Sequence, residues 1–282
     1  MHHDTVSARR KANTVDNFST SIVVFGSGRM GSRIAALACD DRAFDLRACV
    51  THDRSSRLGA LVRDSRTGVP ARDPAADSRT TDSPRIALET AKNAVKTAVF
   101  ADVVIDFSSE SGLHDSIALA RALSAALLVG TTGLSPASID ALTLASRDRA
   151  VLLAPNTSLG VAALSVLVQQ ASKIFGSEYH CSIVEAHHAM KKDAPSGTAL
   201  RLAQAARDAG HTLRDDQILS IRGGDVIGEH TVRFAGPGEY VELTHRATSR
   251  DLFASGALRA AAWLKGKPPK WYTMHDVLGL RS

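Results

Sequence analysis

The sequence predicts an α/β protein with a doubly wound parallel sheet and a second, inserted α+β region. Short apolar segments alternate with segments of helical spacing from Ser21 to Ala154. The first apolar segment runs directly into a glycine-rich turn, residues 26–31 (GSGRMG), and then into a helical pattern. Beyond residue 210 the pattern changes to β-type alternation between glycine turns. We therefore expect a Rossmann-type sheet and, separately, a mixed or antiparallel sheet.

The composition is that of an ordinary soluble globular protein. The chain has 282 residues, enough for two domains, and a formal net charge of +5. Its basic residues are mixed with acidic ones, which argues against nucleic-acid binding and suits a small anionic partner. Cys39, Cys49 and Cys181 lie in apolar segments at no metal-binding spacing, as expected for reduced thiols in a cytoplasmic protein. Residues 1–20 predict a loose N-terminal tail, and no window approaches the roughly 18 to 20 apolar residues of a membrane span.

Strands and helices alternate through the first half of the chain. Apolar runs predict strands at residues 21–25, 46–50, 99–107, 127–129 and 150–154. Helices are expected after the glycine turn, from Ser108 to about residue 126, and from Ser135, with Pro136 in the first turn. Residues 55–97 show no sustained periodicity, so they are expected to be irregular.

A long apolar helix, residues 158–175, is expected to lead into the second region. The elements expected after it are, in order, a strand at 181–184, a helix at 198–209, strands at 218–222, 228–235 and 240–246, and a helix at 255–265. Residues 267–269 (KPP) end the last helix. The apolar tail, residues 271–280, should dock on the folded part of the chain.

The glycine turn has the context of a dinucleotide-binding site. A strand precedes it and a helix follows, so the backbone can approach a pyrophosphate and the first helix amides can bind its charge. Residues 130–133 (GTTG) and 154–157 (APNT) end later strands, and the carboxyl ends of parallel strands meet in one crevice. We expect all three segments to converge on the ligand. The alternatives are a tight turn in another kind of α/β unit and loops chosen only for their turn chemistry.

The residues that read the adenosine ribose are expected at the end of the second strand, roughly 20 residues beyond the glycines. Asp53 could accept hydrogen bonds from the ribose hydroxyls and so favour NADH. His52, Arg54 and Arg57 could bind a 2′-phosphate and so favour NADPH. Basic groups outnumber the acid, so NADPH is the slightly favoured cofactor and NADH stays open. A solvated loop of mixed charge is the alternative interpretation.

Chemical groups are most concentrated in residues 185–198 (EAHHAMKKDAPSGT). His187 and His188 follow a strand, so their side chains should point to opposite sides, and one can donate a proton while the other holds substrate. Lys191 adds a second proton donor or a fixed positive charge. Residues 195–198 (PSGT) begin a helix whose amides and hydroxyls can bind a carboxylate. A surface or structural histidine pair is the alternative; a zinc site lacks a third ligand, so no metal is expected.

Together these motifs resemble the dihydrodipicolinate reductases, also described as 4-hydroxy-tetrahydrodipicolinate reductases. The resemblance extends from about residue 21 to 280 and rests on RMG, VIDF, GTTG, EAHH, KxDAPSGTA, GEHTVRFAG and HxAxSRxxFAxGA. The sequence departs from the family pattern in a glycine loop that is one residue shorter. It also has Thr51 and His52 where many members have an acid and an arginine, and Ser109 in place of a frequent arginine.

The resemblance implies NAD(P)H-dependent reduction of 4-hydroxy-2,3,4,5-tetrahydrodipicolinate to tetrahydrodipicolinate with loss of water, in lysine and diaminopimelate biosynthesis. It implies that His187 is the general acid and that Lys191 is a second catalytic group that also steadies the substrate. The substrate carboxylates would be bound by His188, Ser196, Gly197 and Thr198. The cofactor would be bound by Gly26, Ser27, Gly28, Arg29, Met30, Gly31, Thr51, His52, Gly130, Thr131, Thr132, Ala154, Pro155, Asn156 and Thr157.

Two domains are expected. Residues 21–157 together with 268–282 should form the dinucleotide-binding domain, and residues 158–267 the domain for substrate binding and oligomerisation. The resemblance implies a homotetramer. Two other functions stay open: a dehydrogenase of another small dicarboxylate, and a catalytically silent cofactor-binding sensor. The presence of both His187 and Lys191 beside the carboxylate site argues against the sensor.

Overall fold

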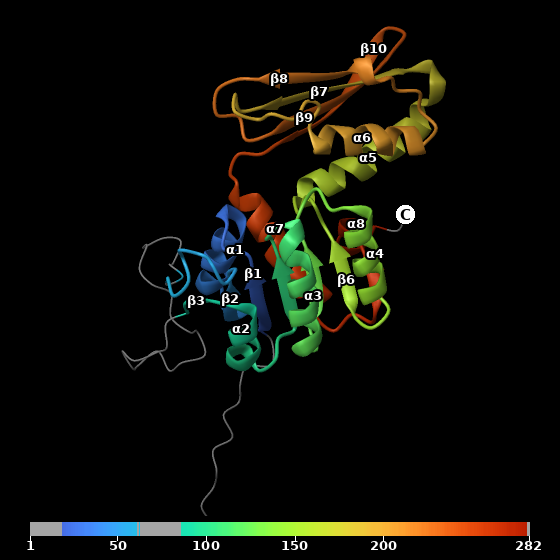
Figure 1. The fold of residues 1–282 in the computed structure, drawn as a ribbon. Helices are drawn as coiled ribbons and strands as arrows, with labels where there is room; N and C mark the ends of the chain where they lie inside the picture. Colours follow the sequence, from blue (N-terminus) through green and yellow to red (C-terminus); the bar gives the residue numbers. More distant parts are fainter. Residues whose placement is uncertain (1–18, 61, 63–85, 281–282) are drawn as a thin grey trace, which may run out of the picture.

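The fold contains two separate sheets. The computed structural model describes residues 19–60, 62 and 86–280. A seven-stranded sheet has the order β11-β6-β5-β4-β1-β2-β3 and all of its pairs are parallel. A four-stranded mixed sheet has the order β10-β9-β7-β8, in which β9 is antiparallel to both neighbours. Figure 1 shows the smaller sheet beyond one end of the larger one. The predicted fold class is confirmed.

The central strands of the seven-stranded sheet are buried on both faces, and their alternate residues enter two different cores. Its strands are β1 (Thr20–Phe25), β2 (Phe44–Val50), β3 (Leu88–Glu89), β4 (Val103–Asp106), β5 (Ala126–Val129), β6 (Ala150–Leu153) and β11 (Lys270–Tyr272). Ile22 and Val24 pack in one core cluster, whereas Val23 and Phe25 pack in the other. This two-sided burial explains why the parallel strands are continuous apolar runs.

Helices cover both faces of this sheet. The cluster that contains Ile22 also contains residues of α1 (Arg29–Asp40), α7 (Asp251–Leu264) and α8 (Met274–Val277). The opposite cluster contains residues of α2 (Ala91–Ala98), α3 (Leu113–Ala122) and α4 (Pro136–Ala145). From β1, in the middle of the sheet, the path proceeds to β2 and β3 on one side and then crosses to β4 on the other. The order reverses between β1 and β4, and ligands bind such sheets off the strand ends at this point.

The smaller sheet is covered on one face only. Its strands are β7 (His180–His187), β8 (Ile218–Arg222), β9 (Glu229–Gly236) and β10 (Glu239–Arg246). The helices α5 (Leu159–Phe175) and α6 (Gly197–Asp208) pack against it and against each other. Figure 1 shows both helices on the side of the sheet that faces the larger domain. The other face carries no helix of the described chain.

Residues 55–97 are not wholly irregular, contrary to the prediction. The described part includes β3, which pairs with β2, and the eight-residue helix α2. Thr90 begins that helix, because its side chain accepts a hydrogen bond from the Asn93 amide. Only Ala94 and Ala98 of α2 are buried, so its apolar pattern is too weak to read from sequence. Residues 61 and 63–85 lie outside the described residues.

Several predicted element limits also need correction. The strand expected from residue 99 begins at Val103, because Val99 has a positive φ of 58° and both it and Phe100 are exposed. The C-terminal tail does more than dock: β11 forms the edge of the large sheet beside β6. Most of the predicted N-terminal tail, residues 1–18, lies outside the described chain, while Thr20 already belongs to β1.

Helix α7 lies within the predicted substrate domain but shares its core with the large sheet. Its residues Ala254, Ala257, Ala261 and Leu264 belong to the same cluster as β1. Its Asp251 also forms an ion pair with Arg33 of α1. We therefore propose that the dinucleotide-binding domain resumes at the start of α7 and not at residue 268.

One segment, Leu159–Glu178, is long and apolar enough to span a membrane, with a mean hydropathy of 1.3. This corrects the expectation that no window approaches such a span. In the structure, Leu164 and Val168 of the segment pack in the core of the smaller sheet, and Ala162 packs in a core of the large sheet. The core helix of a soluble protein can meet the same criteria, and this segment packs one face in the cores, with 28% of the window buried.

Candidate active site

The glycine loop begins the site at the carboxyl end of β1. Gly26 has a φ of +113°, and a Cβ there would lie 2.5 Å from the carbonyl oxygen of Phe107. A Cβ on Gly31 would lie 1.8 Å from the carbonyl oxygen of Gly26, so both positions require glycine. Gly28 has no atom within 4 Å of a Cβ position, and it begins α1 without a side-chain cap. The first amides of α1 therefore have no side-chain cap, which leaves them free to bind a pyrophosphate group.

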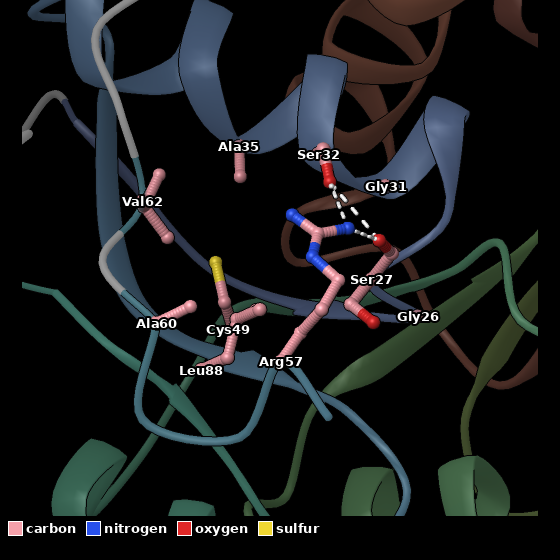
Figure 2. Close-up of a pocket in the computed structure, with 10 residues that line it drawn as sticks. All are labelled: Gly26, Ser27, Gly31, Ser32, Ala35, Cys49, Arg57, Ala60, Val62 and Leu88. Carbon is pink, nitrogen blue, oxygen red and sulfur yellow. Dashed lines mark hydrogen bonds between the residues drawn. The ribbon is translucent and has the colours of Figure 1, made fainter. Parts of the chain in front are cut away.

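A cavity of about 240 Å³ lies beside this loop (Figure 2). It is lined by Gly26, Ser27, Gly31, Ser32, Ala35, Cys49, Arg57, Ala60, Val62 and Leu88. The Arg57 guanidinium reaches across it and donates hydrogen bonds to the Ser27 carbonyl and, at 3.2 Å, to the Ser32 hydroxyl. The buried Thr51 hydroxyl bonds to the Ser27 hydroxyl at 2.8 Å. His52, by contrast, is exposed.

The GTTG segment is held by Asp106, the last residue of β4. The fully buried Asp106 carboxylate accepts hydrogen bonds from Ser108, Ser116 and, at 3.2 Å, the hydroxyl of Thr131. Burial raises the pKa of Asp106, and these hydrogen bonds oppose the rise. Thr132 is exposed beside them. The carboxylate thus ties the loops after β4 and β5 together.

The APNT segment connects the two domains. The Thr157 hydroxyl donates to the Phe253 carbonyl of α7 at 2.6 Å. The Asn156 side-chain amide donates to the Thr198 hydroxyl at the start of α6 at 3.0 Å, and its carbonyl accepts from the Ser158 amide at 2.8 Å. Among the strand-end loops, this one reaches the residues predicted to bind substrate.

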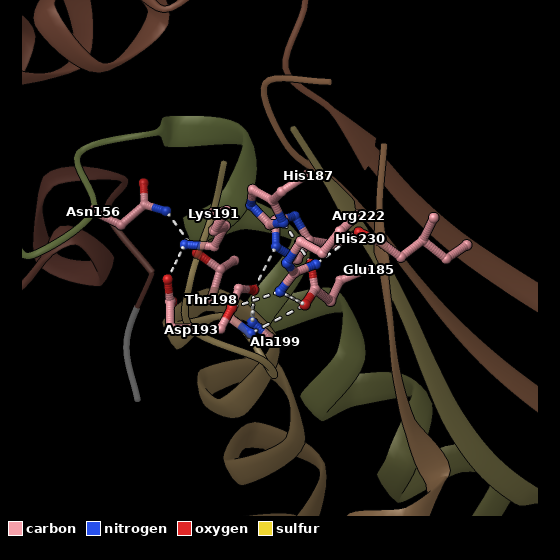
Figure 3. Close-up of polar contacts among 11 residues, drawn as sticks. Asn156, Glu185, His187, Lys191, Asp193, Thr198, Ala199, Arg222 and His230 are labelled. Atoms are coloured by element: carbon pink, nitrogen blue, oxygen red, sulfur yellow. Dashed lines mark hydrogen bonds and ion pairs between the residues drawn. The ribbon is translucent and has the colours of Figure 1, made fainter. Parts of the chain in front are cut away.

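The substrate segment follows β7. His187 is its last residue and is buried, whereas the next residue, His188, is partly exposed. The alternation expected for an extended chain separates the two histidines. Lys191 forms an ion pair with Asp193 at 2.8 Å and is partly buried. Among the polar contacts drawn in Figure 3, Lys191 lies on the same side as Asn156.

The Ser196 side chain begins α6 from a buried position. Its hydroxyl accepts a hydrogen bond from the Ala199 amide at 3.2 Å and bonds to His230 Nε2 at 3.2 Å. Ser196 is 2% exposed, so its hydroxyl is committed to the helix start and does not face solvent. The next residue, Gly197, has open space around its Cβ position. The exposed start of α6 can bind a carboxylate, and the buried Ser196 side chain holds this helix start in place.

A charged network surrounds His187 (Figure 3). Its Nδ1 bonds to the Glu185 carboxylate, which also accepts two hydrogen bonds from Arg222, at 2.9 and 2.6 Å. The His230 ring lies edge-on to the His187 ring with centroids 5.2 Å apart. Burial lowers the pKa of His187, Glu185 raises it, and the charges of Lys191 and Arg222 lower it.

Glu185, Arg222 and His230 belong to the site but were not predicted from the sequence. The alternation along β7 could have predicted that Glu185 faces inward, because it lies on the same side of the strand as His187 and the buried Cys181 and Ile183. A carboxylate in such a register predicts a buried partner. Arg222 and His230 come from β8 and β9, so their approach depends on strand register. Among the described residues, no His, Cys, Asp or Glu cluster could hold a metal ion.

The fold and this site define a two-domain oxidoreductase that uses a nicotinamide dinucleotide. Family models described as the N- and C-terminal parts of dihydrodipicolinate reductase match residues 20–157 and 160–278. The chain therefore belongs to the dihydrodipicolinate reductase family, as its motifs indicated.

Curated relatives agree with this assignment. The chain is 40% identical to the 4-hydroxy-tetrahydrodipicolinate reductase of Anaeromyxobacter dehalogenans (strain 2CP-1 / ATCC BAA-258), over 93% of this chain and 99% of the relative. It is also 40% identical to that of Aquifex aeolicus, over 93% and 100%. A solved structure, dipicolinate-bound dihydrodipicolinate reductase from Paenisporosarcina sp. TG-14, has a similar fold, with a TM-score of 0.70, 19% identity, and coverage of 90% of this chain and 97% of the other.

Proposed function

We propose that this protein reduces 4-hydroxy-2,3,4,5-tetrahydrodipicolinate to tetrahydrodipicolinate with NAD(P)H and loss of water, in lysine and diaminopimelate biosynthesis. The observation that carries the proposal is the His187 imidazole, whose Nδ1 is bonded to Glu185, the residue that also accepts a hydrogen bond from the Ser196 amide at the start of α6. Family membership supports the same reaction. The charge of the site also suits the substrate, because a negatively charged dicarboxylate is bound by cationic side chains and by the amides at a helix start.

His187 supplies the proton in this account. The reaction consumes one proton and releases one water, and His187 Nε2 is the ring nitrogen left to carry that proton. Bound NAD(P)H would supply the hydride, held at the amides after Gly28. A bound dicarboxylate raises the pKa of a nearby imidazole, which favours the charged, proton-donating form. Lys191, which is ion-paired with Asp193 at 2.8 Å, is a second catalytic group in this account and also steadies the substrate.

We assign the substrate carboxylates to His188 and to the start of α6 at Gly197 and Thr198. The open space at Gly197 and the partial exposure of His188 support direct contact with the substrate. Ser196 was expected to bind a substrate carboxylate. In this proposal it does not contact the substrate, because its hydroxyl is already bonded to Ala199 and His230. Its contribution is to hold the helix start in place.

The proposed function is tested with an assay in which the substrate is generated in the reaction mixture. A synthase that makes 4-hydroxy-tetrahydrodipicolinate is coupled to the purified protein, and the oxidation of NADH and of NADPH is followed separately. We expect oxidation that depends on both the synthase and the protein. If neither cofactor is oxidised, the proposed reaction is wrong.

We propose that Arg57 gives the protein a preference for NADPH. The Thr51 hydroxyl is bonded to Ser27, so no carboxylate occupies that position to bind the ribose hydroxyls. His52, Arg54 and Arg57 are all exposed, and of the three only Arg57 has a hydrogen bond to the glycine loop among the described contacts. A guanidinium at this place suits a ribose 2′-phosphate.

Arg57→Ala is therefore expected to raise KM for NADPH about 10-fold and to leave KM for NADH nearly unchanged, because only NADPH carries the extra phosphate. Steady-state kinetics with each cofactor measure this. Arg54→Ala, an exposed arginine of the same loop, is the matched control and should have little effect. A larger effect of Arg54→Ala would place the 2′-phosphate at the end of β2 instead.

We also propose a homotetramer in the cytoplasm that uses the bare face of the smaller sheet. That face exposes four large apolar side chains: Val184, Leu219, Ile221 and Tyr240. Exposed apolar residues gathered on one sheet face are typical of an interface. A second copy of this chain is the occupant that the family resemblance implies. Buried free thiols at Cys49 and Cys181 support a reducing, cytoplasmic environment.

The double variant Leu219→Asp with Ile221→Asp is expected to reduce the mass in solution from four chains to one or two, because it places charges in the apolar interface. Light scattering after size-exclusion chromatography measures the mass. Leu144→Asp changes an equally exposed leucine on α4 and should leave the mass unchanged. A wild-type monomer would contradict the proposal.

A further inference from the structure

Glu185 is a charged group buried without any access to solvent. It is 0% exposed and occupies an inward position of β7, following the buried residues Cys181 and Ile183 at the same face. Removing a carboxylate from water costs several kcal/mol unless close partners compensate. A hydrophobic side chain would continue the core pattern at this position. The buried charge therefore calls for a specific role.

The partners of Glu185 satisfy both of its oxygens. Arg222 donates to Oε2 at 2.9 Å and to Oε1 at 2.6 Å, and the Ser196 amide donates to Oε1 at 3.2 Å. Oε2 also faces His187 Nδ1. Arg222 is itself fixed by the Asp193 carbonyl at 2.6 Å. Burial raises the pKa of Glu185, but hydrogen bonds from Arg222, Ser220 and His187 outweigh it and lower the pKa to about 2.

An ionised carboxylate at Nδ1 decides which nitrogen of His187 carries a mobile proton. A carboxylate only accepts hydrogen bonds, so Nδ1 must keep its hydrogen in both states of the ring. The neutral ring then has its lone pair on Nε2, and the charged ring carries its exchangeable proton there. Nε2 lies near Gly228, where a Cβ would approach it to 3.0 Å. Because residue 228 is a glycine, no side chain from that position crowds Nε2 of the His187 ring.

We propose that Glu185, fixed by Arg222, is a positioning residue that holds His187 in the Nδ1–H form and so directs its acidic proton to Nε2. The inference rests on the proposed function of His187 as the proton donor. Glu185 does not touch the substrate in this account. Through the Ser196 amide it also joins the proton donor to the start of α6, so the two halves of the substrate site share one anchor.

The charged and titratable groups that face His187 come from four segments. They are Glu185 on its own strand, Arg222 on β8, His230 on β9 and Lys191 in the following loop. Burial and the proximity of His187 lower the pKa of His230 to about 4, so His230 is neutral near pH 7. Glu185 is thus the one anion among these four groups. Its removal should make the imidazolium form of His187 harder to reach.

The test compares Glu185→Gln, which keeps the shape and removes the charge, with Glu185→Asp, which keeps the charge on a shorter side chain. In Glu185→Gln we expect kcat to fall about 10- to 100-fold or more, as for the loss of other groups that orient a histidine. The general acid works in its protonated form, so rate is lost as pH rises through its pKa. Removing the carboxylate lowers that pKa, and the alkaline limb of the kcat profile should move about one unit or more to lower pH. Glu185→Asp should restore the position of that limb at least in part.

Asp148→Asn is the matched control, because it removes a carboxylate that pairs with Arg121 and Arg149 far from this network. It should change neither kcat nor the pH profile. The affinity of each variant for dipicolinate and its melting temperature report any purely structural effect. A Glu185→Gln enzyme with lower stability but an unmoved alkaline limb, or a Glu185→Asp enzyme no better than the Gln variant, would overturn the proposal.

A measurement that needs no turnover separates this inference from the proposed function. Nitrogen-15 correlation spectra of the histidine rings identify the tautomer of His187 near neutral pH. We expect Nδ1–H in the wild-type protein and a mixture of tautomers in Glu185→Gln. If the wild-type protein shows the Nδ1–H signal but does not catalyse the proposed reaction, only the proposed function is wrong. A wild-type ring protonated at Nε2 in its neutral form would reject the role of Glu185.

Discussion

Replacing His187 by alanine is expected to lower kcat about 100- to 10,000-fold and to leave the affinity for NAD(P)H unchanged. General acids contribute rate enhancements of this size. The imidazole lies at the end of β7, while the loops that we assign to the cofactor follow β1, β5 and β6, so its loss should not disturb cofactor binding. Steady-state kinetics and a fluorescence titration with NADPH measure the two quantities.

His188→Ala is the matched control for this prediction, because it removes the neighbouring imidazole that we assign to substrate binding. It should raise KM for the substrate more than it lowers kcat, which is the pattern of a group that binds ground state and transition state alike. If His187→Ala retains the wild-type kcat, the proton comes from another group. If the two variants behave alike, the division of roles between the two histidines is wrong.

Replacing Arg222 by methionine is expected to lower the free energy of unfolding by about 3 to 5 kcal/mol at pH 8. The variant leaves the Glu185 carboxylate buried without its two strongest hydrogen-bond donors, and removing one partner of a buried ion pair has effects of this size. Arg121→Met is the matched control, because Arg121 pairs with Asp148 on the exposed surface of the large domain. Its effect should be about 1 kcal/mol or less.

The effect of Arg222→Met should depend on pH. In the wild-type protein the pKa of Glu185 is lowered from 4.5 to about 2, so its contribution to stability is present above pH 4.5 and is lost as pH falls toward 2. Without Arg222, burial raises the pKa, and protonation at acidic pH relieves the buried charge. Urea unfolding should therefore show a smaller loss at pH 5 than at pH 8. An equal loss at both values would show that packing, and not charge, is the cause.

Most of the large sheet could be predicted because its strands are local patterns. Five of its strands are runs of apolar residues buried on both faces, and their order with the helices determines a parallel sheet. The missed strands, β3 and β11, have two and three residues, and each exists because a neighbouring strand supplies its hydrogen bonds. No window of their own sequence contains that information.

The site residues also fall into two groups, those that lie in one local motif and those that only the fold brings together. His187, Lys191 and Thr198 lie within twelve residues of one another, so their chemistry is visible in a single motif. Arg222 reaches Glu185 only because β8 lies beside β7 in the observed register, and Arg57 reaches Ser27 only because the loop after β2 lies beside the glycine loop. Partners brought together by tertiary structure are the part that a single sequence does not reveal.

The central claim is that this protein delivers a hydride from NAD(P)H to C4 of its cyclic dicarboxylate substrate. The most direct measurement uses NADPH and NADH carrying deuterium at the transferable C4 position, with the substrate generated by the synthase, and mass spectrometry of the product. We expect tetrahydrodipicolinate that contains one deuterium at its ring C4. A product without deuterium, or unchanged substrate beside intact cofactor, would contradict it.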